Sequence, residues 1–173
     1  IYFGQELGER GMDAEGYSGR DGRTTIYDYW TVDTVSRWRN GGKFNDKKLT
    51  GDEKRLREFY ARVLALRESM PVLRSGHFYD LMYVNRHLHR QYVFVRQLEK
   101  QVLLVIANFD DQEANLSIHL PEEFFRFIGQ KGQTEVRALD LLSEEETQVD
   151  FTPDRPLCAK VLPWNGLVLS IDL

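Results

Sequence analysis

The hydrophobic period of this sequence changes at Pro71, and that change constrains the fold more than any other feature. From Thr50 to Met70 apolar residues recur every three or four positions, which predicts one long amphipathic helix. Thr50 and Glu53 have the spacing of a capping box at its start, and Pro71 ends it. After Pro71 apolar and polar residues alternate over short segments, as is typical of β-strands. We therefore expect a long helix followed by a β-domain.

The residues after Pro71 predict an antiparallel β-sandwich, because turn signals separate about eight short strands. Glu99-Lys100 is expected to form a hairpin turn, and Asn165-Gly166 is a type I′ turn signal. A helical turn is expected between strands, from Pro121 to Ile128. The expected strands are residues 75–83, 91–96, 101–107, 116–120, 136–142, 147–151, 157–162 and 167–173.

Composition excludes several classes of protein. The 173 residues allow one or two domains, and 42% hydrophobic and 12% aromatic residues indicate a globular chain. A net charge of −4 with scattered basic residues argues against nucleic acid as a partner. The longest apolar run, Val102 to Ala107, is too short to cross a membrane. The single cysteine, Cys158, excludes an internal disulfide and a cysteine-based metal site, and fits a small apolar residue in a strand.

The N-terminal residues predict a buried strand, Ile1 to Phe3, that ends in the polar pair Gln5 and Glu6. No polar segment precedes it, so we expect the sequence to be a piece of a longer polypeptide. The glycine- and charge-rich residues 8–22 predict a long loop. Residues 31–38 predict a short helix capped by Thr31 or Asp33, which residues 40–42 end.

Two of these segments resemble the α-amylase family of glycoside hydrolases. Ile1 to Gly8, IYFGQELG, resembles the motif at the eighth barrel strand, and Gly19 to Trp30 resembles the loop that follows. The resemblance implies an α+β fragment that is mainly β. Residues 1–74 would be the last βα unit of a (β/α)8 barrel, comprising strand, loop and long helix. Residues 75–173 would be the antiparallel β-sandwich C-terminal domain.

The resemblance also implies a function for the longer parent enzyme, which would hydrolyse or transfer α-linked glucose units of oligo- or polysaccharides. In this family an aspartate nucleophile, a glutamate acid/base and a second aspartate lie on earlier barrel strands, so all three would precede Ile1. The fragment alone is therefore expected to be inactive, with a structural or accessory role. We expect no cofactor and no metal in this part. A non-catalytic carbohydrate-binding β-sandwich module is the alternative.

The expected partners follow from the same resemblance. They are an α-glucan, bound through the parent enzyme, and the missing N-terminal part of the barrel. An unpaired strand and an uncovered apolar helix both favour association, so residues 1–70 are expected to mediate self-association.

Six residues are candidates for contact with sugar. The resemblance places Gln5 and Glu6 at the mouth of the parent active site, and local hydrogen bonding is the alternative role for Glu6. Asp21 and Arg23 could grip a glucose unit together, with Arg20 as the alternative arginine. Trp164, beside the predicted turn, could stack on a sugar ring if it is exposed, and a core position is the alternative.

Other polar groups invite weaker hypotheses. His87 and His89 would share a strand face, but no third ligand stands at a spacing that would complete a metal site. Asp110-Asp111 is typical of a turn, and Glu144 to Glu146 of a solvated turn.

Overall fold

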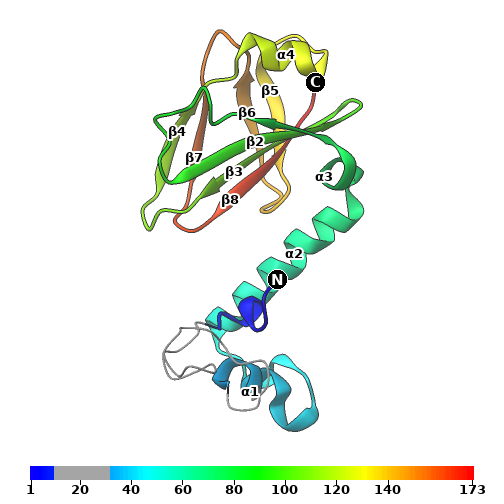
Figure 1. Cartoon of the computed structure of the whole chain (residues 1–173), viewed down its shortest axis with the longest axis vertical. Helices are drawn as coiled ribbons and strands as arrows, with labels where there is room; N and C mark the ends of the chain where they lie inside the picture. The colour runs from blue at the N-terminus through cyan, green and yellow to red at the C-terminus, as the bar shows by residue number, and fades with distance from the viewer. Residues whose placement is uncertain (10–31) are drawn as a thin grey trace. The chain divides into compact units, whose positions relative to one another are not determined.

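A computed structural model describes residues 1–9 and 32–173 (Figure 1). The chain divides into two compact units, residues 1–65 and 66–173, and the division falls inside one helix. Three of the candidate residues, Arg20, Asp21 and Arg23, lie outside the described residues. Within the described ranges, no helix combines the length and the apolar character needed to span a membrane.

The predicted strand at Ile1 to Phe3 is wrong. These residues form no strand, and Ile1 and Tyr2 are 72% and 58% exposed. The chain instead turns through Gly4 (φ 72°), the 3-10 helix η1 (Gln5–Leu7) and Gly8 (φ 74°). A strand needs a neighbour to pair with, and residues 1–9 and 32–65 supply none. The backbone groups therefore bond locally, Gln5 N to Tyr2 O at 3.1 Å and Leu7 N to Gly4 O at 3.0 Å.

The short helix is confirmed as α1 (Asp33–Arg39), but its predicted cap is wrong. The N-cap residue is Val32, whose side chain is fully buried and supplies no hydrogen bond. Burial of Val32 beside Val35, Leu7 and Leu49 fixes the start of the helix in place of a polar cap. The helix ends at Asn40 (φ 42°), followed by the 3-10 helices η3 (Asn40–Gly42) and η4 (Asp46–Lys48).

The long helix is α2 (Gly51–Ser69), and its capping box is confirmed. Thr50 N donates to Glu53 Oε2 at 2.8 Å, and Glu53 N donates to Thr50 Oγ1 at 3.3 Å. Its apolar stripe is uncovered, as expected from the sequence, since Phe59, Val63 and Leu64 are 41%, 40% and 49% exposed. The described residues of this unit contain no strand that could cover them.

The second unit is described throughout and contains eight strands, as predicted. One antiparallel sheet has the order β1-β2-β3-β8-β5-β6, and β4 pairs with β7 in another. Figure 1 shows the two groups of strands, coloured green to red, with α4 at one end. The strands are β1 (His77–Asp80), β2 (Gln91–Leu98), β3 (Gln101–Asn108), β4 (Ala114–Ile118), β5 (Gln133–Asp140), β6 (Glu146–Phe151), β7 (Leu157–Val161) and β8 (Gly166–Ile171).

One core joins both sheets, because alternate residues of each strand point inward. Val93 and Val95 of β2 are fully buried in the same cluster as Ile118 of β4 and Leu157 of β7. Two short helices complete the unit, α3 (Pro71–Ser75) and α4 (Glu122–Ile128). The predicted hairpin at Glu99-Lys100 is confirmed, with Leu98 opposite Gln101.

Two local predictions in this unit are wrong. Asn165-Gly166 does not form a type I′ turn, since the left-handed residue is Trp164 (φ 50°). The reason is that β7 and β8 belong to different sheets, so the loop crosses between sheets and is not a hairpin. His87 and His89 do not share a strand face, because β1 ends at Asp80 and residues 81–90 form turns.

Candidate functional site

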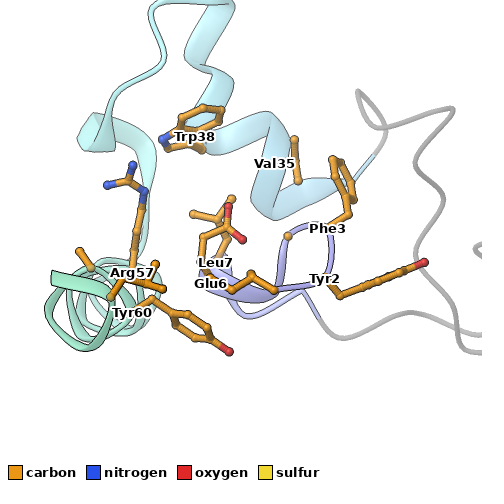
Figure 2. Close-up of a pocket in the computed structure, with 12 residues that line it drawn as sticks. Tyr2, Phe3, Glu6, Leu7, Val35, Trp38, Arg57 and Tyr60 are labelled. Carbon is orange, nitrogen blue, oxygen red and sulfur yellow. The ribbon is translucent and has the colours of Figure 1, made fainter. Parts of the chain in front are cut away.

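The first unit contains a pocket of about 500 Å³ where the N-terminal turn meets α1 and α2 (Figure 2). Its walls are mostly aromatic and aliphatic, and its two charged residues are Glu6 and Arg57. The Arg57 guanidinium lies 5.9 Å from the centre of the Trp38 ring, which is cation–π geometry. The lining residues are Ile1, Tyr2, Phe3, Gly4, Glu6, Leu7, Val35, Trp38, Arg57, Tyr60, Ala61 and Leu64.

The two candidates at the N-terminus have different environments. Gln5 is exposed, and its Oε1 accepts a hydrogen bond from Tyr2 N at 2.9 Å, so this side chain stabilises the turn. Glu6 is half-buried and lines the pocket (Figure 2). Glycoside hydrolysis normally requires two carboxyl groups about 5 Å or more apart across the bond. Glu6 is the one carboxylate among the described residues that line this pocket.

A second pocket of the same unit, of about 470 Å³, has a more polar lining. Thr34 Oγ1 donates to Glu9 Oε2 at 2.7 Å on one wall. On another, Arg37 Nε donates to Glu53 Oε1 at 3.0 Å, and Arg37 Nη2 also bonds this carboxylate. Hydrogen bonds from Arg37 lower the pKa of Glu53 against the opposing effect of burial, and the bond from Thr50 N acts in the same direction.

The sequence analysis did not predict the cluster of polar residues that lines this second pocket. Glu53 was recognisable from the capping box, but nothing in the sequence pairs it with Arg37 on another helix. Glu9 belongs to no sequence motif that would have marked it as a site residue. Because Glu53 is held by Arg37 and by Thr50, it is a structural carboxylate, and the other acids of the lining are Glu9 and the exposed Asp33 and Asp52.

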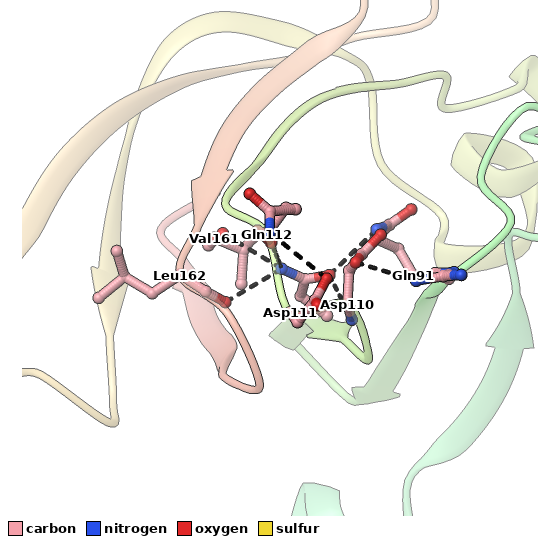
Figure 3. A network of polar contacts seen from close by, with 8 residues as sticks. Gln91, Asp110, Asp111, Gln112, Val161 and Leu162 are labelled. Carbon is pink, nitrogen blue, oxygen red and sulfur yellow. Dashed lines mark hydrogen bonds and ion pairs between the residues drawn. The ribbon is translucent and has the colours of Figure 1, made fainter.

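In the second unit, Trp164 is 70% exposed. Its backbone N–H donates to Asp110 O at 3.0 Å, which joins the 162–165 loop to the turn after β3. Buried Asn108 fastens the two loops together, as the dashed contacts of Figure 3 show. Asp110-Asp111 lies in a turn as predicted. The expectation that Trp164 could occupy the core is wrong, and it remains a candidate surface residue.

Among the residues the structure describes, no group of three or more histidine, cysteine or acidic side chains could hold a metal. His87 Nε2 lies 3.0 Å from Ser117 O, so this ring is used in a local contact. Cys158 lies in β7 as expected, but its side chain is exposed and not packed in the core.

No protein-family model matches the sequence, and no curated protein matches it. Solved structures do match in fold. An alpha-amylase from Anoxybacillus is 16% identical, with a TM-score of 0.55, over 98% of this chain and 28% of that one. AmyP in complex with maltose is 14% identical, with a TM-score of 0.64, over 98% and 30%. The alpha-amylase of Geobacillus thermoleovorans, complexed with acarbose, is 13% identical, with a TM-score of 0.56, over 99% and 29%.

The chain thus spans less than a third of the length of these structures. At such identities the likeness shows the fold. It confirms the fold class expected from the sequence, a mainly β chain that matches the C-terminal portion of α-amylase structures.

Proposed function

We propose that this chain is the C-terminal part of an α-amylase-type glycoside hydrolase that acts on α-linked glucose oligo- or polysaccharides. Residues 1–74 would complete the catalytic barrel, and residues 75–173 would form the C-terminal domain. The observation that carries the proposal is the fold match to AmyP, over 98% of this chain but 30% of that one. The AmyP structure contains maltose, and a related one contains maltotriose.

The apolar surface of the first unit supports a role inside a larger fold. Phe59, Val63 and Leu64 are 41%, 40% and 49% exposed, and Leu64 also lines the pocket beside the exposed Ile1 and Tyr2. Burying one such side chain contributes about 1.5–3 kcal/mol, so leaving several uncovered is unfavourable. The remaining strands of a barrel would cover them, and a barrel strand would then pair with residues 1–3.

Within that assembly the candidate residues take the roles that the resemblance implies. Glu6 would face the active-site mouth, since it already lines a pocket, and Gln5 would accompany it once the turn is replaced by a strand. Asp21 would contact a glucose unit together with one arginine, Arg23 or, as the alternative, Arg20. The nucleophile and the general acid/base would come from the rest of the barrel, so the chain by itself is inactive.

The experiment compares two samples on maltotriose and on an activated maltoside. One is the recombinant 173-residue chain, and the other is the endogenous polypeptide captured with an antibody raised against that chain. We expect turnover by the captured polypeptide, which should be about three times as long, and none by the recombinant chain. Turnover by the recombinant chain that is lost in Glu6→Gln would overturn the proposal, as would a captured polypeptide without activity.

A further inference from the structure

The dipeptide Asn-Gly occurs twice in the sequence, as Asn40-Gly41 and as Asn165-Gly166. Glycine has no side chain to hinder approach to its own backbone nitrogen, so the amide carbon of the preceding asparagine can reach that nitrogen. Ring closure between the two atoms gives a succinimide, which water opens to aspartate or isoaspartate. The rate of closure depends on how the fold holds the asparagine side chain.

The side chain of Asn165 is folded back over its own peptide bond. Its Oδ1 accepts a hydrogen bond from Gly166 N at 2.8 Å, which brings the amide carbon Cγ towards that nitrogen. Among the described residues, no other group bonds the Asn165 side chain. Asn165 is also exposed, so water and base can reach it. The fold thus holds the two reacting atoms near each other, as closure of the succinimide ring requires.

The sheet leaves the Gly166 N–H available. β3 and β8 lie side by side (Figure 1), and Asn108 N donates to Asn165 O at 2.8 Å at the end of their pairing. Hydrogen-bonded and non-hydrogen-bonded pairs alternate along an antiparallel ladder, so the next pair, Ala107 with Gly166, is non-hydrogen-bonded. The Gly166 N–H therefore points away from β3. On the other side of β8, the pairing with β5 reaches only as far as Leu169.

Asn40-Gly41 is a comparison within the same chain. Asn40 Nδ2 donates to Asn45 Oδ1 at 2.9 Å, and ring closure would have to break this bond. Asn40 is also half-buried, whereas Asn165 is exposed. The fold therefore favours ring closure at Asn165 and opposes it at Asn40, although the two dipeptides are identical.

We propose that Asn165 is a site of spontaneous modification, at which the folded chain converts asparagine into isoaspartate and aspartate. The Gly166 N–H gives its proton to a base, and the nitrogen forms a bond to Asn165 Cγ. The Cγ–Nδ2 bond breaks, and Nδ2 takes a proton from water and leaves as ammonia. Water then adds to one of the two succinimide carbonyls, and opening at the main-chain carbonyl gives isoaspartate.

Conversion to isoaspartate would weaken the start of β8. The backbone then runs through Cβ and Cγ, which adds one atom between Asn165 Cα and Gly166 N. The carbonyl that accepts the Asn108 N–H becomes a carboxylate outside the backbone, and the pairing of Ala107 with Gly166 must shift. Gly166 itself is fixed by the fold, since a Cβ there would lie 2.8 Å from Ile106 O. The reactive dipeptide therefore cannot be removed at the glycine without cost to the sheet.

The test incubates the 173-residue chain in ¹⁸O-labelled water at neutral pH and maps its peptides by mass spectrometry. Incorporated ¹⁸O marks residues converted during the incubation, and electron-transfer fragmentation distinguishes isoaspartate from aspartate. We expect Asn165 to react about fivefold faster than Asn40 or more. In urea the two rates should become similar, because the contacts that distinguish the two sites are lost.

Two variants separate the effect of these contacts from that of the dipeptide. Asn45→Ala removes the partner of the Asn40 side chain and should raise the rate at Asn40 severalfold, with the rate at Asn165 unchanged. Asn165→Asp has the charge of the products but the normal backbone length. The aged chain, enriched in isoaspartate, should therefore have a lower Tm than Asn165→Asp.

Three results would overturn the proposal. They are conversion at Asn40 as fast as at Asn165 in the folded chain, conversion at Asn165 without isoaspartate, and no change at Asn40 in Asn45→Ala. All the readouts are masses or melting temperatures and none involves turnover, so failure here is distinguishable from failure of the proposed function.

Discussion

The guanidinium group of Arg37 holds the carboxylate of Glu53, with Nε 3.0 Å from Oε1 and 3.1 Å from Oε2. The same carboxylate accepts the Thr50 N–H at 2.8 Å. Glu53 is 7% exposed, so its charge is largely withdrawn from water. The Glu53 side chain therefore caps the N-terminus of α2 and also holds α1 against the first turn of α2.

Replacing this carboxylate should destabilise the first unit. Glu53→Gln retains a cap acceptor but removes the charge facing Arg37, and we expect a loss of about 1–2 kcal/mol at pH 7, since the Arg37 side chain is partly solvated. Glu58→Gln changes an exposed glutamate of the same helix and should have an effect within about 0.5 kcal/mol. The measurement is helix unfolding by circular dichroism.

The pH dependence of the same variant has a defined sign. The pKa of Glu53 is lowered in the folded state, chiefly by hydrogen bonds from Arg37, so the unfolded state binds the proton more readily. The stabilisation is present above the ordinary glutamate pKa of about 4.3 and is lost as the pH falls through the lower folded value. The difference between wild type and Glu53→Gln should therefore shrink below about pH 4. A constant difference from pH 7 to pH 3 would contradict this account.

Asn85 should be essential to the second unit. It is fully buried, its Nδ2 donates to Leu81 O at 2.9 Å and His119 O at 3.0 Å, and its Oδ1 accepts from His119 N at 2.7 Å. Asn85→Ala leaves these backbone groups unpaired, so we expect a loss of about 2–3 kcal/mol in urea unfolding. Asn115→Ala, at an exposed position in β4, is the matched control. Equal effects of the two substitutions would show that the buried network is not stabilising.

Gly166 is required by a close approach between strands. A Cβ at this position would lie 2.8 Å from Ile106 O, a backbone atom of β3 that cannot move aside. Gly166→Ala should lower the free energy of unfolding by about 1–3 kcal/mol. Gly51→Ala, in the first turn of α2, faces only the flexible end of Arg55 and should stabilise by up to about 1 kcal/mol. An unchanged free energy of unfolding in Gly166→Ala would mean that β3 and β8 can move apart at this point without loss of stability.

The isolated chain should self-associate through residues 1–70. The apolar side chains Phe59, Val63 and Leu64 share one helix and remain accessible. We expect sedimentation to show association that rises with concentration, and Leu64→Lys to weaken it severalfold. Ser69→Lys adds the same charge to the same helix without removing an apolar group, and should have little effect. A monomer at all concentrations in the unmodified chain would contradict this prediction.

The elements set by local chemistry were predictable from the sequence. The capping box, the stop at Pro71 and the β2–β3 hairpin depend on neighbouring residues, so spacing alone locates them. Strands such as β4 and β6 followed from alternation, since buried and exposed residues alternate along them.

Features set by distant partners were not predictable. Residues 1–3 have strand-forming side chains but no strand beside them, so they turn. Asn165-Gly166 matches a hairpin signal, yet the sheet assignment of β7 and β8 rules out a hairpin and moves the left-handed residue to Trp164. The pairing of Arg37 with Glu53 joins two helices and left no local signal.

The central claim is that the catalytic carboxylates lie outside these residues. The most direct measurement uses the endogenous polypeptide, captured by antibody and treated with a fluorosugar inactivator that traps the glycosyl–enzyme intermediate. Mass spectrometry then locates the labelled peptide. We predict a labelled aspartate outside residues 1–173. A label on any carboxylate within these residues, Glu6 or Glu9 included, would contradict the proposal.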